Sequence, residues 1–312
     1  MVRHNLVAAV TFASSAWLAA CGGTPDDTPT TVPGPFDEIV SPAGLGSETP
    51  HLAAGAGGAI LSWLEPTGPD SDETYSLRFS RLAGDGWTEP RTVIDRSDLF
   101  VNWADFPSVV ELASGQLAAH WLQYNGPGTY AYQVRLAFSS DGGMTWSNPV
   151  IPHETETQTE HGFVSLAPAG DGIDVVWLDG RDYAEHPDDG VMSLRHARVA
   201  STGAIGPETV LDARTCDCCQ TSVAAIPGGS IVAYRGRTAA EIRDIQIVRR
   251  VDGAWEPPAV VHADGWHIPA CPVNGPEIAA TGSHVRVSWF TAAADSGRVY
   301  AAMSHDAGAT FG

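Results

Sequence analysis

The chain has 312 residues, of which 43% are hydrophobic, 33 are glycine and 22 are proline, a composition that suits a folded, turn-rich β protein rather than a disordered chain. Its formal net charge is -20 and all 17 Lys/Arg positions are arginine, so it lacks the clustered cations that binding to nucleic acid or an anionic lipid surface requires. The missing lysine also excludes a Walker-type phosphate loop and Schiff-base chemistry.

The N-terminus has the features of a bacterial export signal. Arg3-His4 precedes an apolar stretch over residues 6–18, which is too short for a comfortable membrane span, and the stretch leads to Leu18-Ala19-Ala20-Cys21. This ending resembles a bacterial lipobox. The resemblance implies a signal peptide over residues 1–21, a lipid on Cys21 that anchors the protein to a membrane, and an extracytoplasmic location in the periplasm or on the cell surface. A plain cleaved signal peptide is the alternative.

Five aromatic residues recur at nearly equal intervals after a segment that we expect to be a flexible tether, residues 22–35. They are Trp63, Trp121, Trp177, Tyr234 and Trp289, spaced by 58, 56, 57 and 55 residues, and each follows a short apolar run. A repeat of this length, read as four short strands and their turns, is one blade of a β-propeller. The spacing therefore predicts an all-β propeller domain over residues 36–312.

Each repeat is expected to open with a short strand, followed by a glycine-containing turn, the strand with the aromatic residue and a third strand, all with the alternation typical of half-buried strands. The first strands are expected at residues 51–54, 108–112, 163–167, 222–226 and 277–280. Because first strands flank the central channel, the segments that precede them should converge on one face.

The most specific motif follows the third strand of two repeats. It reads Ser139-Ser140-Asp141-Gly142-Gly143-Met144-Thr145-Trp146 in one and Ser304-His305-Asp306-Ala307-Gly308-Ala309-Thr310-Phe311 in the other. Aspartate accepts backbone N–H bonds and glycine supplies a positive φ, so the motif locks a turn. It resembles the Asp box, or BNR repeat, of the sialidase-type β-propellers, and the resemblance covers nearly everything after the tether. It implies that Asp141 and Asp306 are structural and lie on the side away from the ligand site.

The resemblance also implies a six-bladed propeller with a sialidase-like site, and here the sequence departs from the family. About five blades are present, and the chain stops just after the second Asp box, as if truncated at its C-terminus. Where the family has an Arg-Ile-Pro motif, this chain has Glu48-Thr49-Pro50-His51. Arg235, Arg237 and Arg243 fall in a loop of the ligand face, where a surface or salt-bridge role is favoured over an anion clamp. We find no Tyr-Glu nucleophile pair.

Four cysteines lie in two segments that each precede a first strand, Cys216-Asp217-Cys218-Cys219 and His267-Ile268-Pro269-Ala270-Cys271. Three interpretations are open. An even number of cysteines in an oxidising compartment ordinarily forms disulfides. The Cys-x-Cys-Cys spacing also suits a copper or zinc site, with Cys216, Cys218, Cys219, Cys271 and His267 as ligands and His161 as a further one. A redox-active thiol pair is less favoured, because the thioredoxin-like context is missing.

Two other segments hold equivalent places before first strands, Trp103-Ala104-Asp105-Phe106 and Glu160-His161-Gly162. Trp103 and Trp266 are candidate stacking platforms for sugars. The interpretation that the sequence favours is a lipid-anchored binding protein, with a Cys/His cluster at the channel mouth and a glycan or small molecule as ligand. The alternative is a glycan-binding protein or an exo-sialidase-like glycoside hydrolase, with Asp105 or Glu160 as acid/base and the arginine loop holding an acidic sugar.

Overall fold

The computed structural model describes residues 38–68 and 74–312. The predicted signal peptide, Cys21 and the tether at 22–35 lie outside these residues and stay predictions. The chain divides into two units, Met1–Glu38 and Ile39–Gly312, and all the β-sheets of the described residues belong to the second. No helix in the described part of the chain is both long and apolar enough to cross a membrane.

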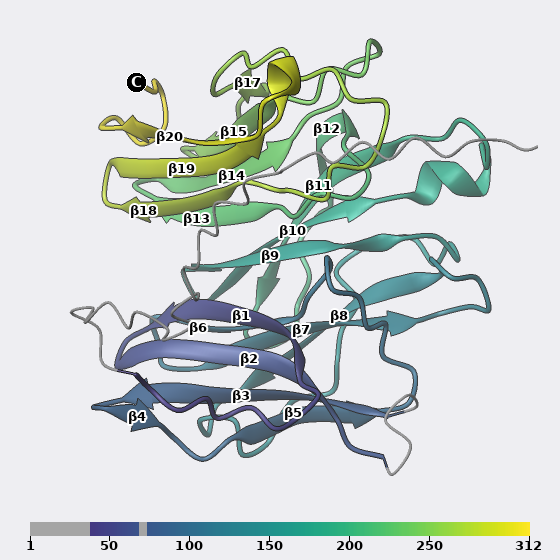
Figure 1. The fold of residues 1–312 in the computed structure, drawn as a ribbon. Coiled ribbons are helices and arrows are strands. Elements are labelled where there is room, and N and C mark those ends of the chain that lie inside the picture. Colours follow the sequence, from purple (N-terminus) through teal and green to yellow (C-terminus); the bar gives the residue numbers. More distant parts are fainter. Residues whose placement is uncertain (1–37, 69–73) are drawn as a thin grey trace, which may run out of the picture. The chain divides into compact units, whose positions relative to one another are not determined.

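Five antiparallel sheets follow one another in chain order (Figure 1). The first contains β1 (Glu48–Gly55), β2 (Gly58–Pro66), β3 (Tyr75–Ala83), β4 (Gly86–Trp87) and β5 (Arg91–Arg96). The second contains β6 (Ser108–Glu111), β7 (Leu117–Tyr124) and β8 (Tyr132–Ser139). The third contains β9 (His161–Ala169), β10 (Gly172–Asp179), β11 (Met192–Ala200) and β12 (Thr209–Thr215). The fourth contains β13 (Ser222–Ile226), β14 (Gly229–Arg235), β15 (Ile245–Val251), β16 (Ala254–Trp255) and β17 (Ala259–Val260), and the fifth β18 (Glu277–Thr281), β19 (His284–Thr291) and β20 (Arg298–Ser304).

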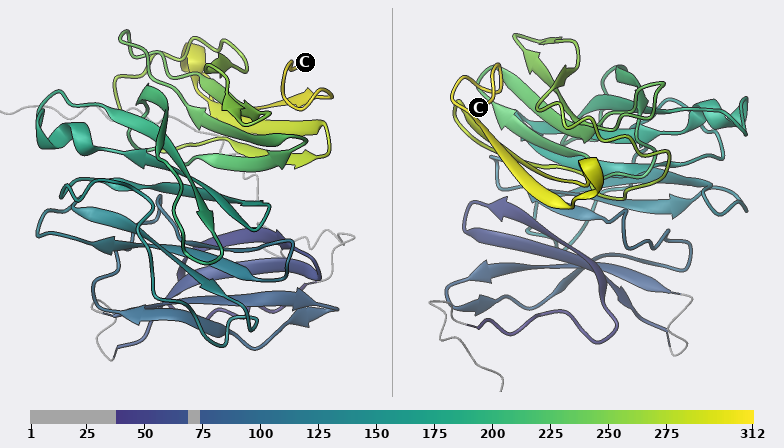
Figure 2. Two further views of the ribbon diagram at one scale, coloured as in Figure 1. Left: turned by 180° about the vertical axis from the view of Figure 1, so that it is seen from behind. Right: turned by 45° about the horizontal axis from the view of Figure 1, so that its top comes forward.

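Each sheet is one blade, so the all-β propeller with five blades that the aromatic spacing predicts is confirmed. The first strand of each blade is the innermost one: β1 lies against β6, β6 against β9, β9 against β13, and β13 against β18. Figure 2 shows the sheets from two further sides, following one another in chain order from purple to yellow. The five inner strands line a central cavity of about 480 Å³.

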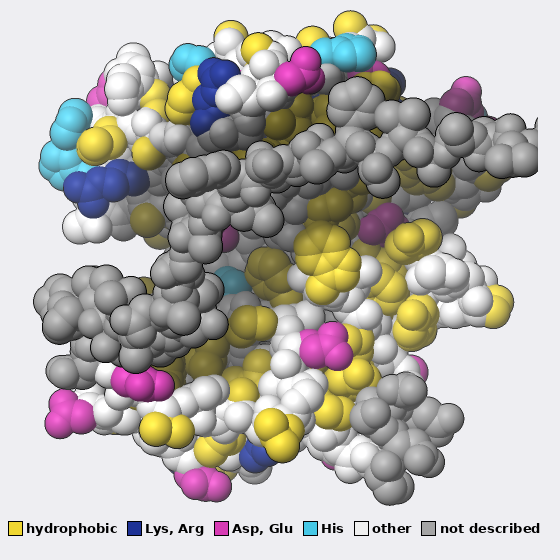
Figure 3. All heavy atoms as spheres, in the orientation of Figure 1, with side chains coloured by type: hydrophobic (Ala, Val, Ile, Leu, Met, Phe, Trp, Pro, Cys, Tyr) yellow, Lys and Arg dark blue, Asp and Glu magenta, His cyan; other side chains and the backbone are white. Residues whose placement is uncertain are grey.

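Acidic side chains are scattered over the face seen in Figure 3 rather than gathered in one patch, as expected for a solvated acidic surface.

The periodic aromatic residues hold neighbouring blades together. Trp121, Trp177, Tyr234 and Trp289 are 0–4% exposed, and each belongs to a separate apolar cluster that joins its own blade to the preceding one. Trp121, for example, packs with Leu77 of β3. The period of the sequence is therefore the period of the interfaces between blades.

The Asp boxes form the locked turns that their sequence predicts. Asp141 Oδ1 accepts the backbone N–H of Thr145 at 3.0 Å, and Oδ2 accepts the Thr145 hydroxyl at 2.6 Å; Asp306 makes the same two bonds with Thr310, at 2.9 and 2.7 Å. For Asp306 the hydroxyl bond from Ser304, and for Asp141 the bonds from Thr145, are the largest causes that hold the pKa of these carboxyls well below the usual range. The boxes follow the C-terminal ends of β8 and β20.

The shared geometry of the two boxes extends to their contact with the preceding blade. Gly143 has a φ of 88° and Gly308 a φ of 80°. A Cβ atom at Gly143 would overlap the ring of Phe79 in β3, and one at Gly308 would overlap Ile231 in β14. Each box glycine is thus needed both for its backbone conformation and for close approach to the sheet of the preceding blade.

Gly143→Ala should therefore lower the free energy of unfolding by about 2–4 kcal/mol, because a left-handed backbone and an overlap are combined. Gly115 is the matched control: its φ is 81°, but no atom lies within 4 Å of the place that a Cβ would occupy. Gly115→Ala should cost only about 1 kcal/mol. Urea unfolding of both variants measures the difference, and equal losses would contradict the close approach to Phe79.

Candidate functional site

The segments before β6, β9, β13 and β18 converge at one end of the channel, as their equivalent places in the repeat predict. They enclose a pocket of about 360 Å³, which we call the mouth pocket. Its lining includes Trp103, Asp105, Tyr130, Tyr132, Glu160, Asp217, Cys218, Cys271 and Val273. Residues far apart in the sequence therefore share one site, because every inner strand begins at this end of the propeller.

Two carboxyl groups of the mouth pocket share a single hydroxyl group. The Tyr132 hydroxyl oxygen lies 3.0 Å from Asp105 Oδ2 and 2.8 Å from Glu160 Oε1. Asp105 and Tyr132 are 2% and 1% exposed, whereas Glu160 is only half-buried. Asp105 Oδ1 accepts the backbone N–H of Phe163 at 2.8 Å. A side chain at Gly162 would overlap Asp105 and the Tyr132 ring, so the arrangement requires glycine there.

This geometry requires a proton on one of the two carboxyls. A tyrosine hydroxyl has one hydrogen and can donate to only one acceptor, so the second oxygen–oxygen contact is favourable only when that carboxyl is itself protonated. Burial, together with the charge of Glu160, raises the pKa of Asp105 to about 8. Burial, together with the charge of Asp217, raises the pKa of Glu160 to about 7. The Asp105–Tyr132–Glu160 group therefore holds a proton near neutral pH.

The walls of the mouth pocket are aromatic and carry no net positive charge. Trp103 is 73% exposed and Tyr130 is 59% exposed. Among the described residues, none that lines this pocket is basic. Asp217 is engaged by Arg237, whose Nη1 lies 2.7 Å from Asp217 Oδ2.

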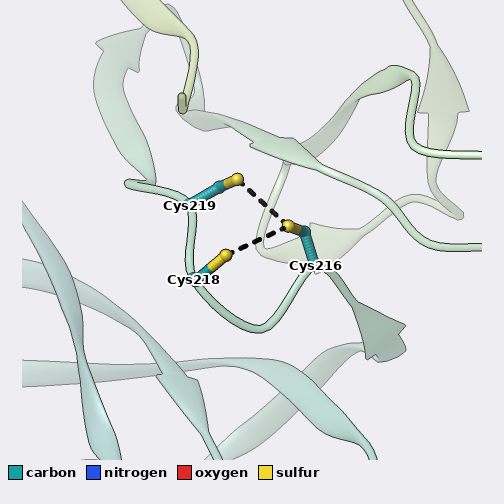
Figure 4. A group of neighbouring side chains, drawn as sticks. All are labelled: Cys216, Cys218 and Cys219. Atoms are coloured by element: carbon teal, nitrogen blue, oxygen red, sulfur yellow. Dashed lines mark hydrogen bonds between the residues drawn. The ribbon is translucent and has the colours of Figure 1, made fainter. Parts of the chain in front are cut away.

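The other wall of the mouth pocket carries the cysteines (Figure 4). Cys216 Sγ lies 3.0 Å from Cys219 Sγ and 4.0 Å from Cys218 Sγ, and Arg243 Nη1 donates a hydrogen bond to Cys216 Sγ at 3.2 Å. Contacts with the Cys218 and Cys219 thiols, with the Arg243 charge beside them, lower the pKa of Cys216. Cys216 and Cys219 are buried, while Cys218 is half-buried and interacts with the exposed Cys271. All four are free thiols in this structure.

The two walls are tied together by one side chain, Gln220. Its Nε2 donates to the carbonyl oxygen of Ala104 at 2.6 Å, and its Oε1 accepts the N–H of Gly275 at 3.0 Å. Ala104 belongs to the segment before β6 and Gly275 to the segment before β18. The amide therefore connects the second blade to the fifth beside the mouth pocket.

The three arginines of the predicted ligand loop are all bound to other protein groups. Arg235 is 1% exposed, donates to the carbonyl oxygens of Asn274, Arg243 and Phe290, and stacks on Trp266. Arg237 binds Asp217 and Glu241, and Arg243 binds Glu241 and Cys216. The structure thus places all three in internal contacts, and none of them is among the residues that line the mouth pocket. Trp266 is 7% exposed, so the expectation of an exposed platform is wrong for this residue.

The two histidines of the predicted metal cluster lie apart from the thiols. The buried imidazole of His161 stacks on His153 with ring centroids 4.3 Å apart, and its Nε2 lies 3.7 Å from Asp179 Oδ2. Side chains alternate along a strand, so Glu160 faces the mouth pocket while His161 turns into its own blade. His267 is exposed and pairs through its backbone with Ile242. The group of metal-capable side chains in the described residues consists of Cys216, Cys218 and Cys219, a correction to the expected Cys/His cluster.

Tyr132 is the residue that sequence reasoning missed. Its hydroxyl forms with Glu160 the kind of Tyr-Glu contact that the sequence does not reveal, because the two residues are 28 positions apart. Its position in the repeat could have indicated this role. Tyr132 lies at the start of a third strand, and in an antiparallel blade the third strand starts at the same end as the first strand.

Fold and site together define a five-bladed β-propeller with a proton-holding pocket at one end of its channel. No protein-family model matches the sequence, and no curated protein matches it either. Among solved structures, the chain is similar to a protein of unknown function from Dyadobacter fermentans DSM 18053, with a TM-score of 0.53 and 14% identity over 84% of this chain and 79% of that one. It is also similar to an ulvan lyase of polysaccharide lyase family PL25, solved with bound -[GlcA(1-4)Rha3S]-, with a TM-score of 0.52 and 15% identity over 84% of this chain and 68% of that one. These likenesses show the fold.

The raised pKa values predict how stability depends on pH. Both folded-state values, about 8 for Asp105 and about 7 for Glu160, lie above the ordinary values near 4. The stabilisation is therefore complete below about pH 4 and is lost as the pH rises through 7 and 8. Asp105→Asn keeps an oxygen that accepts the Phe163 N–H and gains an amide that donates to the Tyr132 oxygen. It should therefore remove most of this pH-dependent loss of stability, which is on the order of several kcal/mol.

Urea midpoints measured between about pH 5.5 and 9 test this dependence. Asp85→Asn, at an exposed turn carboxyl, serves as the control and should follow the wild type. The same slope for Asp105→Asn and the wild type would show that Asp105 titrates normally.

Proposed function

We propose that this chain is a carbohydrate-active enzyme that hydrolyses glycosidic bonds in the mouth pocket, with Glu160 as the general acid/base that contacts the substrate. The observation that carries the proposal is the Asp105–Tyr132–Glu160 group. A glycosidic bond is hydrolysed when a carboxylic acid protonates the departing oxygen and water adds to the anomeric carbon, giving its proton to the carboxylate that remains. Such an acid/base needs a pKa near the working pH. The similar solved structures share too little sequence identity to support more than the fold, so the site carries the chemistry.

The three members of the group take different roles because their exposure differs. Glu160 is the accessible carboxyl, whereas Asp105 and Tyr132 are buried behind it. Asp105 has the higher pKa of the two carboxyls, so the resting proton belongs on Asp105, which donates to the Tyr132 oxygen while Tyr132 donates to Glu160. Moving each proton one place along this chain delivers a proton to Glu160 without opening the pocket to bulk water.

The chemistry of the walls supports a neutral sugar as substrate. Exposed Trp103 and Tyr130 offer apolar faces on which a sugar ring can stack. A substrate with a carboxylate needs a cation to hold it, and the arginines nearby are already bound by Asp217, Glu241 and backbone carbonyls. This distinguishes the proposed activity from that of a sialidase, whose arginine clamp the sequence also lacks. Glycan binding without turnover is the second candidate, supported by the same exposed aromatic residues.

Glu160→Gln should lower kcat/KM on the substrate by about 10²–10⁴-fold, because an amide cannot give up a proton to the leaving group. The measurement is release of reducing sugar from a panel of neutral and acidic oligosaccharides. Tyr132→Phe should also lose activity, because it interrupts the path from Asp105. Glu89→Gln, at an exposed position, is the matched control and should keep wild-type rates.

Three results would decide against this assignment. Full turnover by Glu160→Gln would remove Glu160 as the acid, and cleavage of sialosides or uronides alone would overturn the neutral substrate. Saturable binding of a glycan without any turnover would favour the second candidate.

We further propose that the protein acts outside the cytoplasm, held by a lipid on Cys21, on the strength of the lipobox-like Leu18-Ala19-Ala20-Cys21. Cys21→Ser should abolish incorporation of labelled fatty acid and release the chain from the membrane fraction. Cys271→Ser, which changes an exposed thiol of the propeller, should still be labelled. Fatty-acid labelling of Cys21→Ser at the wild-type level would contradict the anchor.

A further inference from the structure

The three cysteines of the 216–219 segment are arranged around one common point. Their Sγ atoms all lie within 4.8 Å of one another, and Cys216 Sγ contacts both Cys218 and Cys219. A metal ion with metal–sulfur bonds of about 2.3 Å holds its sulfur ligands roughly 3.8–4.0 Å apart. The observed distances of 3.0 and 4.0 Å span this value, so small side-chain rotations admit an ion.

The four thiols form one connected group. Two of the contacts, Cys216–Cys219 and Cys218–Cys271, are those that two disulfides would use, but the contact between Cys216 Sγ and Cys218 Sγ joins the two pairs. Cys218 and Cys219 are adjacent in the sequence and are poorly placed to pair with each other. Arg243 donates a hydrogen bond to Cys216 Sγ, a contact that suits a thiolate or a metal-bound sulfur because both carry negative charge.

The charges around the group also suit a cation. Metal binding requires deprotonated thiols, and the negative charge of three thiolates at half-buried or buried positions then needs compensation, since an unpaired buried charge is costly. The Arg243 guanidinium, which is itself buried, supplies one positive charge, and a bound cation supplies the rest. Neither His161 nor His267 reaches the group, so its donors are all sulfur, which favours Cu(I) or Zn(II) over Mg²⁺, Ca²⁺ or Mn²⁺.

We propose that Cys216, Cys218 and Cys219 bind one thiophilic cation, Cu(I) or Zn(II), and that Cys271 supplies the fourth position from the segment before β18. Cys218 and Cys271 both line the mouth pocket, so the ion lies in the wall opposite Glu160. The site is built entirely from side chains outside the Asp105–Tyr132–Glu160 group. The inference therefore stands or falls independently of the proposed hydrolase activity.

The test uses the full chain, purified without chelator and kept reduced. We expect one equivalent of copper or zinc by elemental analysis, and separate titrations with Cu(I) and Zn(II) against chromogenic chelators identify which ion binds more tightly. Replacing either ion with Co(II) should give the thiolate-to-cobalt charge-transfer absorption. Cys216→Ser, Cys218→Ser and Cys219→Ser should each weaken binding by more than about 100-fold, since loss of even an outer-sphere partner costs about 10–100-fold.

Two further variants keep the test decisive if a buried substitution prevents folding. Cys271→Ser changes an exposed residue and should weaken binding while leaving the far-ultraviolet spectrum unchanged. His267→Ala is the matched control in the same segment and should bind as the wild type does. Failure of the reduced chain to bind either ion stoichiometrically, or unchanged affinity in Cys218→Ser and Cys271→Ser, would overturn the site. Four cysteines that are all bridged, in a chain that binds no ion after reduction, would assign them to disulfides instead.

Discussion

The contact on which the rest of the structure depends is the packing of one aromatic side chain per repeat onto the preceding blade. Trp121, Trp177, Tyr234 and Trp289 are almost fully buried and each joins two sheets. Burying an aromatic ring removes a large apolar area from water, so these contacts dominate the interfaces between blades. The polar ends of three of them donate to aspartates: Trp177 Nε1 to Asp179 Oδ2, the Tyr234 hydroxyl to Asp212 Oδ2 and Trp289 Nε1 to Asp264 Oδ2. The Trp121 Nε1 group has no such partner among the described residues. Some of the aspartates that make the chain acidic therefore serve as hydrogen-bond acceptors for the aromatic residues between blades.

This packing brings the functional side chains together, because it fixes the end of the propeller at which each inner strand begins. Asp105 and Glu160 precede the inner strands of the second and third blades, while Cys218 and Cys271 precede those of the fourth and fifth. A carboxyl wall and a sulfur wall thus face one pocket, although no two of these segments are close in the sequence. The Asp boxes have the opposite placement, at the ends of β8 and β20, and serve the interfaces between blades through Gly143 and Gly308.

The sequence predicts those features that depend on period and position. The spacing of the aromatic residues is enough for the propeller, and the places of Asp105 and Glu160 before first strands are enough to expect a shared face. The direction in which each side chain points could not be predicted from the sequence. Glu160 and His161 are neighbours, yet one faces the pocket and the other its own blade. Tyr132 has the appearance of an ordinary strand residue, and only the three-dimensional contact shows that its hydroxyl joins two carboxyls. Trp266 is covered because Arg235 lies over its ring, which no pattern in the sequence reveals.

Gln220 joins two distant segments of the chain beside the mouth pocket. Both ends of its terminal amide are used, one on Ala104 and the other on Gly275, so a single planar group fixes how the segments before β6 and β18 lie relative to each other. Asparagine, one methylene shorter, has the same hydrogen-bonding groups but a shorter reach. The placement of these two segments beside the pocket is thereby held by hydrogen bonds of defined direction, in addition to the less directional packing of the sheets around them.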